Sequence, residues 1–441
     1  MKINIVTDKV MALVGGKSKG ADVSVSTGWS STVSYKENKL ANLSSDQQTA
    51  VSVRIIKDGK FGVAATNQID EVGLNKMISD SLFVSEFGRE VNFKLPEKQN
   101  CIVPKTYDSS IEKITEEQLI NRGNHIIVEI VKSAKNFSVA QLILEKSNSE
   151  SVFANTNGVI AHSLSSENGI LIELANIQEG DFFQIGLGND SVKDDINTDR
   201  LIQKLLKWIA DGEKIVLPKS GSYPVIFTPE AAGEWLDYLL TALNGRAVNE
   251  KTSKLSGKLG EKMFDEKLTI IDDPTIDWGV ESYGLDDEGV PGQKKQLIKN
   301  GVVNSYYYDL NQASKAKVES TGNGSRGGYA QAEPSVSNIS VSGGDQPYTQ
   351  LLSGISKGMV VYGFIGSGQN NPYNGDFQVT VQLGYWVENG QIVGRVKNTA
   401  ISGNVFELLK NRLAWISKDR ETLGSVTVPY VCFDGVTVTS G

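Results

Sequence analysis

The chain has 441 residues, too many for one ordinary hydrophobic core, so its length predicts two or three domains. Its 39% hydrophobic and 22% charged residues are typical of a globular protein and argue against a disordered one. The net charge of −8 argues against a general nucleic-acid-binding protein, which normally carries a basic face. No run of about 18 apolar residues is present, so no membrane span is expected.

Cysteine and histidine, the residue types that most often build metal sites, are scarce. The two cysteines, Cys101 and Cys432, make a disulfide framework or a cysteine-rich metal site unexpected, and free thiols fit a cytoplasmic protein. The stretch Met1–Asp8 does not resemble a signal peptide, which also favours a cytoplasmic location. The two histidines, His125 and His162, are expected to have structural or surface roles, so a catalytic triad is weakly supported.

Residues 1–100 are predicted to form an α+β unit with an antiparallel sheet. After a short helix that ends at Gly15-Gly16, alternating apolar residues predict strands over Asp22–Tyr35 and Thr49–Ile56. Lys57–Lys60 predicts a hairpin turn, and the apolar spacing of Ile69–Phe87 predicts an amphipathic helix.

Residues 101–218 are predicted to form a second α+β unit. Thr115 begins a capping sequence for an amphipathic helix, and Leu201–Ile209 predicts another. Between these helices, apolar segments predict strands over Val139–Glu145, Val152–Ala154 and Ile170–Ala175.

Residues 219–441 are predicted to form a mostly-β domain, either a curled antiparallel sheet or a barrel. A late helix is expected over Val405–Ile416. Strands are expected over Val302–Tyr308, Met359–Phe364, Phe377–Val387 and Val426–Val438. The predicted fold class is therefore α+β.

One helix in this domain is a candidate site. Thr228 can cap it, Pro229 suits its first position, and it is expected to continue to Asn244-Gly245. Glu230 and Glu234 stand four residues apart and are expected on one face near its N-terminus. The simpler explanation is that the helix dipole favours a carboxylate at Glu230 and that Glu234 is solvated. The alternative is that Glu230 keeps a polar role in a cleft that once held a metal.

Two loops are candidate ligand sites. Asp286-Asp287-Glu288 is an acidic turn that could bind a hard cation such as calcium, although a solvated loop is the expectation. Gly322–Gly327 fits the letters of a dinucleotide fingerprint, but no strand leads into it and no helix follows, so a flexible loop is expected.

The order and spacing of several short segments resemble the TldD/PmbA family over nearly the whole chain. These segments are Val53-Arg54, Lys57–Gly62, Asn155–Gly158, Gly284–Pro291, Leu297–Val303, Ser320–Gly324, Pro334–Asn338 and Ile401–Asn404. In zinc-bearing TldD-like members, a His-Glu-x-x-x-His motif opens the helix, and a cysteine in a C-terminal loop completes the site.

The resemblance implies a TldE/PmbA-type subunit without the zinc motif. Pro229 and Glu234 stand where the family motif has histidines, Glu230 matches its glutamate, and Cys432 falls after the expected position of the metal cysteine. Proline cannot ligate zinc, so the three helix residues are interpreted as a vestigial site. No catalytic, metal or cofactor-binding residue is assigned to this chain.

The resemblance also implies a partner and a substrate class. A TldD-like subunit that carries zinc is expected as the partner of a heterodimer, with a homodimer as the alternative, and unfolded peptides are the expected substrates. Binding to nucleic acid or membranes is not expected. The residues considered for a peptide cleft are Asp287, Glu288, Gly289, Asn323 and Arg326. Alternative functions are a homodimeric hydrolase that uses Glu230, Asp287 and Glu288, and a peptide-binding scaffold.

Overall fold

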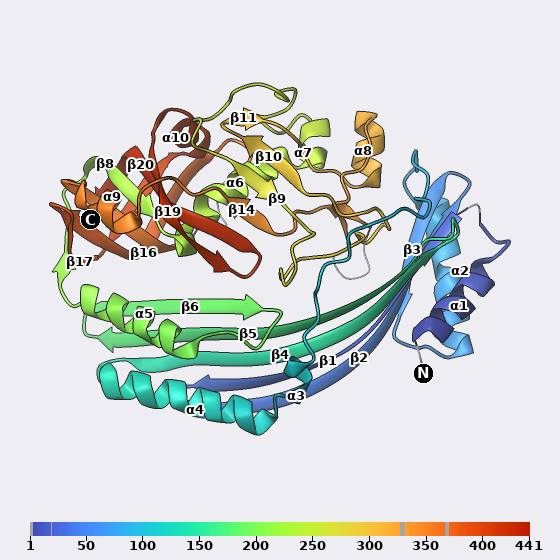
Figure 1. Cartoon of the computed structure of the whole chain (residues 1–441), viewed down its shortest axis with the longest axis horizontal. Helices are drawn as coiled ribbons and strands as arrows, with labels where there is room; N and C mark the ends of the chain where they lie inside the picture. The colour runs from blue at the N-terminus through green and yellow to red at the C-terminus, as the bar shows by residue number, and fades with distance from the viewer. Residues whose placement is uncertain (1–2, 19, 327–330, 367–369) are drawn as a thin grey trace.

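A computed structural model describes residues 3–18, 20–326, 331–366 and 370–441. Its N-terminal half is built on a six-stranded antiparallel sheet of long, curved strands (Figure 1). In sheet order the strands are β3 (Lys60–Thr66), β2 (Lys39–Lys57), β1 (Gly20–Lys36), β4 (Ser138–Asn155), β5 (Ile160–Gln178) and β6 (Asp181–Ser191).

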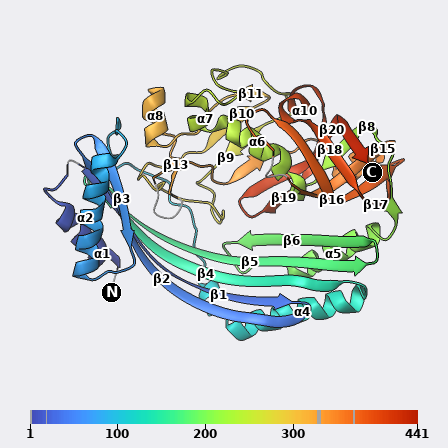
Figure 2. The ribbon, with the colours of Figure 1, turned by 180° about the vertical axis from the view of Figure 1, so that it is seen from behind.

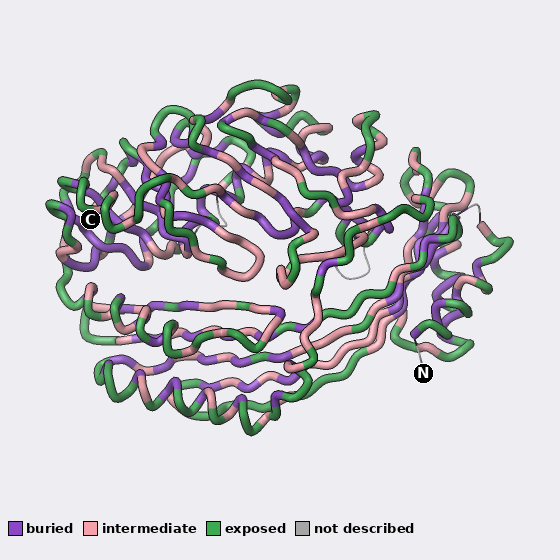
Figure 3. The backbone as a smooth tube through the Cα atoms, in the orientation of Figure 1, coloured by how far each residue is buried: buried purple, intermediate pink, exposed green. Residues whose placement is uncertain are grey.

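Helices cover the two ends of this sheet and build a separate core at each end. Helices α1 (Ile3–Val14) and α2 (Glu71–Phe87) pack on one end, where they bury side chains such as Val23 and Met77. Helices α3 (Ser110–Lys113), α4 (Glu116–Ser133) and α5 (Thr198–Asp211) belong to the other end. Between the two cores, much of the sheet is half-buried or exposed (Figure 3). Residues 1–100 and 101–218 share this one sheet, and each core takes residues from both segments, such as Val152 in one core and Tyr35 in the other.

Local sequence signals account for much of this half. The Thr115 side chain accepts a hydrogen bond from the Gln118 amide, and the Gln118 side chain accepts one from the Thr115 amide, so the predicted capping box is confirmed. The hairpin at Lys57–Lys60 is also confirmed, because these two residues pair where β2 turns into β3. The alternation in β1 places Val23 and Val25 in the core.

The C-terminal half contains a closed five-stranded barrel, which confirms the α+β prediction and decides between a curled sheet and a barrel. Strand β8 pairs with β15 and β20, β16 pairs with β15 and β18, and β18 closes the ring on β20. The bounds of these strands are β8 (Gly221–Phe227), β15 (Lys357–Ile365), β16 (Asp376–Glu388), β18 (Thr399–Asn404) and β20 (Val426–Ser440).

Shorter elements extend the barrel sheet and cover it. The further strands are β7 (Ile215–Val216), β9 (Ile270–Asp272), β10 (Lys295–Lys299), β11 (Val302–Val303), β12 (Gly324–Ser325), β13 (Glu333–Pro334), β14 (Ile339–Val341), β17 (Gln391–Val396) and β19 (Leu413–Leu423). The helices are the 3-10 turn η1 (Pro229–Ala231), α6 (Gly233–Leu243), α7 (Gly245–Asn249), α8 (Leu310–Ala316), α9 (Tyr348–Ser353) and α10 (Val405–Asn411).

Two predicted elements were wrong in extent. The strand expected over Val302–Tyr308 is only β11, because the tyrosines that follow leave the sheet and pack into the core around α6. The helix expected over Val405–Ile416 ends at Asn411, because Leu413 begins β19 and pairs with Phe433 of β20. Both errors arise from apolar runs that suit a helix, a strand or a buried loop equally well.

The two halves face each other across the β6 side of the large sheet (Figures 1 and 2). Strand β6 is an edge strand, paired in the described residues only with β5, and it lies nearest to the barrel.

No helix in the described part of the chain is long and apolar enough to cross a membrane.

Candidate functional site

The candidate helix is interrupted, which corrects the prediction of one helix from Thr228 to Asn244. Pro229 opens the 3-10 turn η1, the Thr228 side chain makes no capping hydrogen bond, and α6 begins only at Gly233. Glu230 and Glu234 therefore belong to different helical segments. Both nevertheless line one cavity of about 460 Å³, together with Asp237 and Tyr238 of α6 and other residues.

Glu234 is buried, so the expectation that it is solvated was wrong. Its side chain accepts a hydrogen bond from Asn370 Nδ2 at 3.4 Å. Burial, with the Glu234 charge as the next cause, raises the pKa of the neighbouring Tyr238 to about 12. The Tyr238 hydroxyl consequently stays protonated at neutral pH.

Glu230 is held in an ion-pair cluster around Lys204, which projects from α5 of the N-terminal half. The Lys204 ammonium contacts Glu230 Oε1, and it donates to Glu421 Oε2 of β19 at 2.5 Å. Burial alone would favour the neutral amine, but the two carboxylates prevail and raise the pKa of Lys204. One cation is thus shared by two carboxylates from the C-terminal half.

Aromatic side chains enclose this cluster. Lys204 Nζ lies 5.6 Å from the Trp208 ring centroid, and Trp208 packs edge-on against Tyr362. Tyr430 donates to Glu421 Oε1 at 3.0 Å and stacks on Tyr348 with ring centroids 4.1 Å apart. Burial first, and then nearby charges, raises the pKa of both stacked tyrosines, so their hydroxyls remain hydrogen-bond donors.

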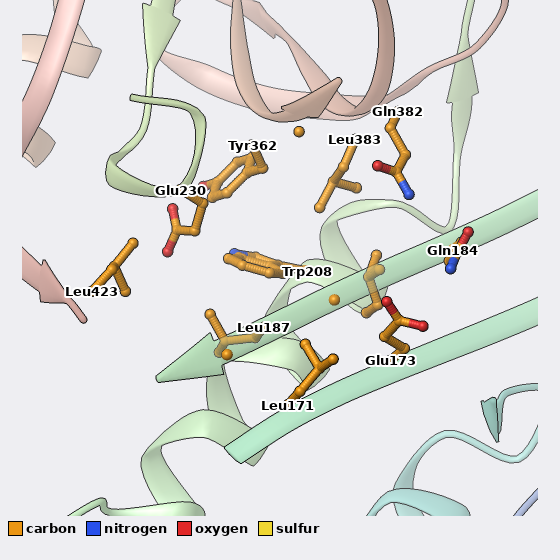
Figure 4. A pocket seen from close by; sticks show the side chains of 14 residues that line it. Leu171, Glu173, Gln184, Leu187, Trp208, Glu230, Tyr362, Gln382, Leu383 and Leu423 are labelled. Atoms are coloured by element: carbon orange, nitrogen blue, oxygen red, sulfur yellow. The ribbon is translucent and has the colours of Figure 1, made fainter. Parts of the chain in front are cut away.

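A second cavity, of about 350 Å³, lies on the other side of Glu230 (Figure 4). Its floor is formed by β5 and β6, and its other walls come from α5, η1 and barrel strands β15 and β16. Glu230 and Gly363 line both cavities, which therefore meet at the Glu230 side chain. We call the two cavities together the Glu230 groove.

The residues around Glu230 do not fit a zinc ion. Proline has no donor atom, and the carboxylate that matches the family glutamate already faces the ammonium of Lys204, which repels a divalent cation. Nowhere in the described ranges do three or more His, Cys, Asp or Glu side chains gather in a way that could hold a metal.

The cysteines and histidines make no hydrogen bond or ion pair with Lys204, Glu230 or Glu421 in the described part of the chain, although Cys432 belongs to the apolar cluster on which Tyr348 and Tyr430 pack. Cys432 is buried in β20 within an apolar cluster, and burial followed by the charge of Asp434 raises the pKa of its thiol. Cys101 is also a free thiol. His125 pairs with Asp199 at 3.0 Å on the surface, and His162 is exposed on β5. The surface roles predicted for both histidines agree with these positions.

Two of the five residues considered for a peptide cleft, Glu288 and Arg326, take part in a buried ionic junction between the two halves. Arg54 of β2 donates to Glu288 Oε1 at 2.6 Å and to Asp22 Oδ2 at 2.8 Å. Arg326 donates to the other Asp22 oxygen at 2.7 Å. The Glu288 side chain also accepts from the Leu310 amide at the start of α8. We call Asp22, Arg54, Glu288 and Arg326 the ionic junction.

The acidic turn next to the junction is neither solvated throughout nor arranged for calcium. Asp286 and Glu288 are buried, and Asp286 accepts hydrogen bonds from the amides of Glu288, Val290 and Gly324. Gly289 adopts φ +83°, and a side chain there would also meet the Phe153 ring at 2.6 Å. The expectation of a solvated loop was therefore wrong for this turn.

The remaining two candidates also tie loops together. Asn323 is buried and donates to Asp272 and to the Ser335 carbonyl. Asp287 is exposed and accepts from the Arg326 amide at 2.8 Å. Their contacts lie around β1, β2, β9 and α8, whereas those of Glu230 come from α5 and β19, so the structure does not combine Glu230 with Asp287 and Glu288.

Sequence reasoning missed Lys204, Glu421, Asp22 and Arg54. Lys204 lies in a recognisable amphipathic helix, but nothing in that pattern marks one lysine as buried. The pairing of β1 with β2 places Asp22 opposite Arg54. One charged residue in each of two apolar, alternating strands is the signal that could have identified the junction.

The ionic junction predicts a large effect of Arg54→Met on folding stability. The substitution leaves Asp22 and Glu288 buried without their shared cation, so the free energy of unfolding should fall by about 3–5 kcal/mol in urea titrations. The control is Arg246→Met, which breaks exposed pairs and should change stability little. Equal effects of the two substitutions would contradict the assigned role of the junction.

Asp309 predicts a pH dependence of stability. Burial and, next, the charge of Glu288 raise its pKa to about 7, above the usual value for an unfolded aspartate. The folded protein therefore binds more protons between about pH 4 and 7, and this residue makes stability fall as the pH rises through that window.

Asp309→Asn keeps the helix cap that Asp309 forms with the Gln312 amide and removes the charge. The variant should be more stable than the wild type at pH 8, by as much as about 4 kcal/mol, and should show a smaller loss of stability between pH 5 and 8. Thermal unfolding across this pH range tests it, and a variant whose pH profile parallels the wild type would contradict the assignment.

The ion-pair cluster around Lys204 predicts that Lys204→Met destabilises the fold. Two carboxylates would face each other without a cation, so we expect a loss of about 3 kcal/mol that Glu230→Gln partly restores in the double variant. The matched control is Lys207→Met, because Lys207 lies in the same helix and makes an exposed ion pair with Asp211. This substitution should change the free energy of unfolding little. A destabilisation that the second substitution does not relieve would show that charge balance is not the cause.

Two family models match the chain. The model of the PmbA/TldA metallopeptidase C-terminal domain matches residues 220–440, and the model of PmbA/TldA metallopeptidase domain 1 matches residues 21–84. The first contains η1, α6 and the barrel, and the second contains the strands that carry Asp22 and Arg54.

Related proteins extend the match over the full length. A Methanocaldococcus jannaschii protein is 30% identical over 394 residues, covering 87% of this chain and 88% of that protein. A metalloprotease of the same organism is 27% identical over 441 residues, covering 96% and 94% of the two chains. The metalloprotease PmbA of Escherichia coli O157:H7 is 24% identical over 451 residues, covering 95% and 93%.

The fold matches a solved structure of TldE from Thermococcus kodakarensis. The TM-score is 0.90 at 22% identity, and the match covers 99% of each chain. The domain matches and the relative at 30% identity show that the chain belongs to the PmbA/TldD metallopeptidase family.

Proposed function

We propose that this chain is the subunit without zinc in a complex with a TldD-like metalloprotease, and that it holds extended peptides for its partner. The observation that supports the proposal most is the Lys204 ammonium between Glu230 and Glu421, at the position where zinc-bearing relatives open their metal motif. A permanent cation from the chain itself takes the electrostatic place of a metal ion but supplies no Lewis acid.

The Glu230 groove supports peptide binding. Its cavity of about 350 Å³ borders β6, which pairs with β5 and with no other strand of the described residues. An extended peptide can add to such an edge as a further strand, with main-chain hydrogen bonds for affinity and with its alternate side chains directed into cavities. A second cavity that adjoins the first at Glu230 lengthens the groove, which suits an extended chain better than a compact small molecule.

The alternative of an independent hydrolase built on Glu230, Asp287 and Glu288 is less well supported. Glu230 pairs with Lys204 and Glu288 pairs with Arg54, so each carboxylate is already engaged by a cation of the chain itself. A general base must lie within hydrogen-bond reach of the proton that it removes, and these ion pairs occupy the carboxylates. A peptide-binding scaffold without a catalytic partner would use the same groove and differs only in its partner.

Co-expression with a TldD-like protein from the same source tests the proposal. We expect co-purification, about one zinc ion per heterodimer by elemental analysis, and peptidase activity towards unfolded peptides in the mixture only. Chelator should abolish that activity, and zinc should restore it.

The isolated chain provides the opposing outcomes. Hydrolysis by the purified chain in the presence of chelator would contradict the proposal, and loss of that turnover in Glu230→Gln would instead establish the independent hydrolase. Peptide binding with neither co-purification nor hydrolysis would favour the scaffold.

A further inference from the structure

The β5–β6 side of the Glu230 groove contains a carboxylate that the ion-pair cluster does not use. Glu173 of β5 lines the cavity of about 350 Å³, and within the described ranges it has no hydrogen-bond or ion-pair partner. The other carboxylate that lines this cavity, Glu230, contacts the Lys204 ammonium. Glu173 therefore gives this cavity an uncompensated negative charge.

The strand pairing explains why Glu173 faces open space. Ile170, Ile172 and Leu174 of β5 point into the core with the helices, so Leu171 and Glu173 point to the opposite face, towards the barrel. On β6 the residues directly opposite Leu171 and Glu173 are Gly188 and Gly186.

These two glycines create the space above the carboxylate. A Cβ added at Gly186 would come within 3.6 Å of the Glu173 side chain, which is ordinary contact and requires no unusual backbone angle. A larger residue would be tolerated by the strand and would cover Glu173. The glycine therefore leaves the carboxylate uncovered without being needed for the backbone.

The remaining walls complete a site for a long cationic side chain. In Figure 4 the Trp208 ring lies between Glu173 and Glu230, with Leu171 and Leu187 below it, Gln184 on the same side as Glu173 and Gln382 on the opposite wall. Apolar and aromatic walls suit the methylene stem of lysine or arginine, while a carboxylate and amide oxygens suit its charged end.

We infer that this cavity binds a lysine or arginine side chain of the peptide, with Glu173 as its counter-charge. The inference rests on the proposed function, because the peptide is taken to add to the β6 edge that borders the cavity. It goes further by giving this part of the groove a preference for cationic residues, set by Glu173 and by the space above Gly186.

The test measures peptide affinity of the full-length chain by fluorescence anisotropy. The probes are three labelled peptides of Gly, Ser and Ala with neutral, blocked ends and one central residue, which is lysine, norleucine or glutamate. Norleucine keeps the stem of lysine without its charge. We expect the lysine peptide to bind at least fivefold more tightly than the norleucine peptide, and the glutamate peptide to bind most weakly.

Two substitutions and one control locate the preference. Glu173→Gln should remove the lysine preference and leave the norleucine affinity nearly unchanged. Gly186→Val should weaken binding of the lysine and norleucine peptides alike, because it fills the cavity. The control is Glu145→Gln, which removes an exposed carboxylate on the neighbouring strand β4. This variant loses one negative charge, as Glu173→Gln does, and should keep the preference for lysine.

The outcomes separate the two proposals. Equal affinity of the wild type for all three peptides, or a lysine preference that persists in Glu173→Gln, would overturn the cationic site while peptide binding by the groove stands. Absence of measurable binding for every peptide would overturn both.

Discussion

The contact between Lys204 and two carboxylates is the interaction on which the candidate site depends. It joins the last helix of the N-terminal half to the turn after the first barrel strand and to β19. Charges of this kind are costly to bury alone, so each member requires the others. The contact therefore fixes the position of η1 relative to the large sheet and sets the width of the Glu230 groove.

A second set of buried charges performs a similar task at the other end of the molecule. The ionic junction connects β1 and β2 to loops that precede and follow α8. In both contacts a cation of the N-terminal half, Lys204 of α5 or Arg54 of β2, pairs with carboxylates of the C-terminal half. Arg326 is the reverse case, a cation of the C-terminal half that pairs with Asp22 of β1. These charged contacts act beside an apolar one, because Leu383 and Tyr385 of β16 belong to the core at the α4–α5 end of the large sheet.

Sequence reasoning predicted the elements whose signals are local. The capping box at Thr115 and the hairpin at Lys57–Lys60 were recoverable because hydrogen-bonding residues mark them directly. Apolar runs marked the barrel strands β15, β16 and β20, whereas β18 was not predicted. Boundaries after Val303 and Asn411 were not recoverable, since apolar residues there continue into loops and strands that tertiary packing selects. For the site, the family pattern identified Glu230, but its partner Lys204 has no local signal. The acidic turn shows the same limit, since three carboxylates in a row look solvated until Arg54 is placed beside them.

We propose that Lys204 is the cation at Glu230 and that the site does not bind zinc. Zinc binding by the purified full-length chain, measured by competition with a chromophoric chelator and by elemental analysis, tests it most directly. The account predicts no stoichiometric zinc in the wild type and the same result for Glu230→Gln. One tightly bound zinc ion per chain, lost in Glu230→Gln, would contradict it.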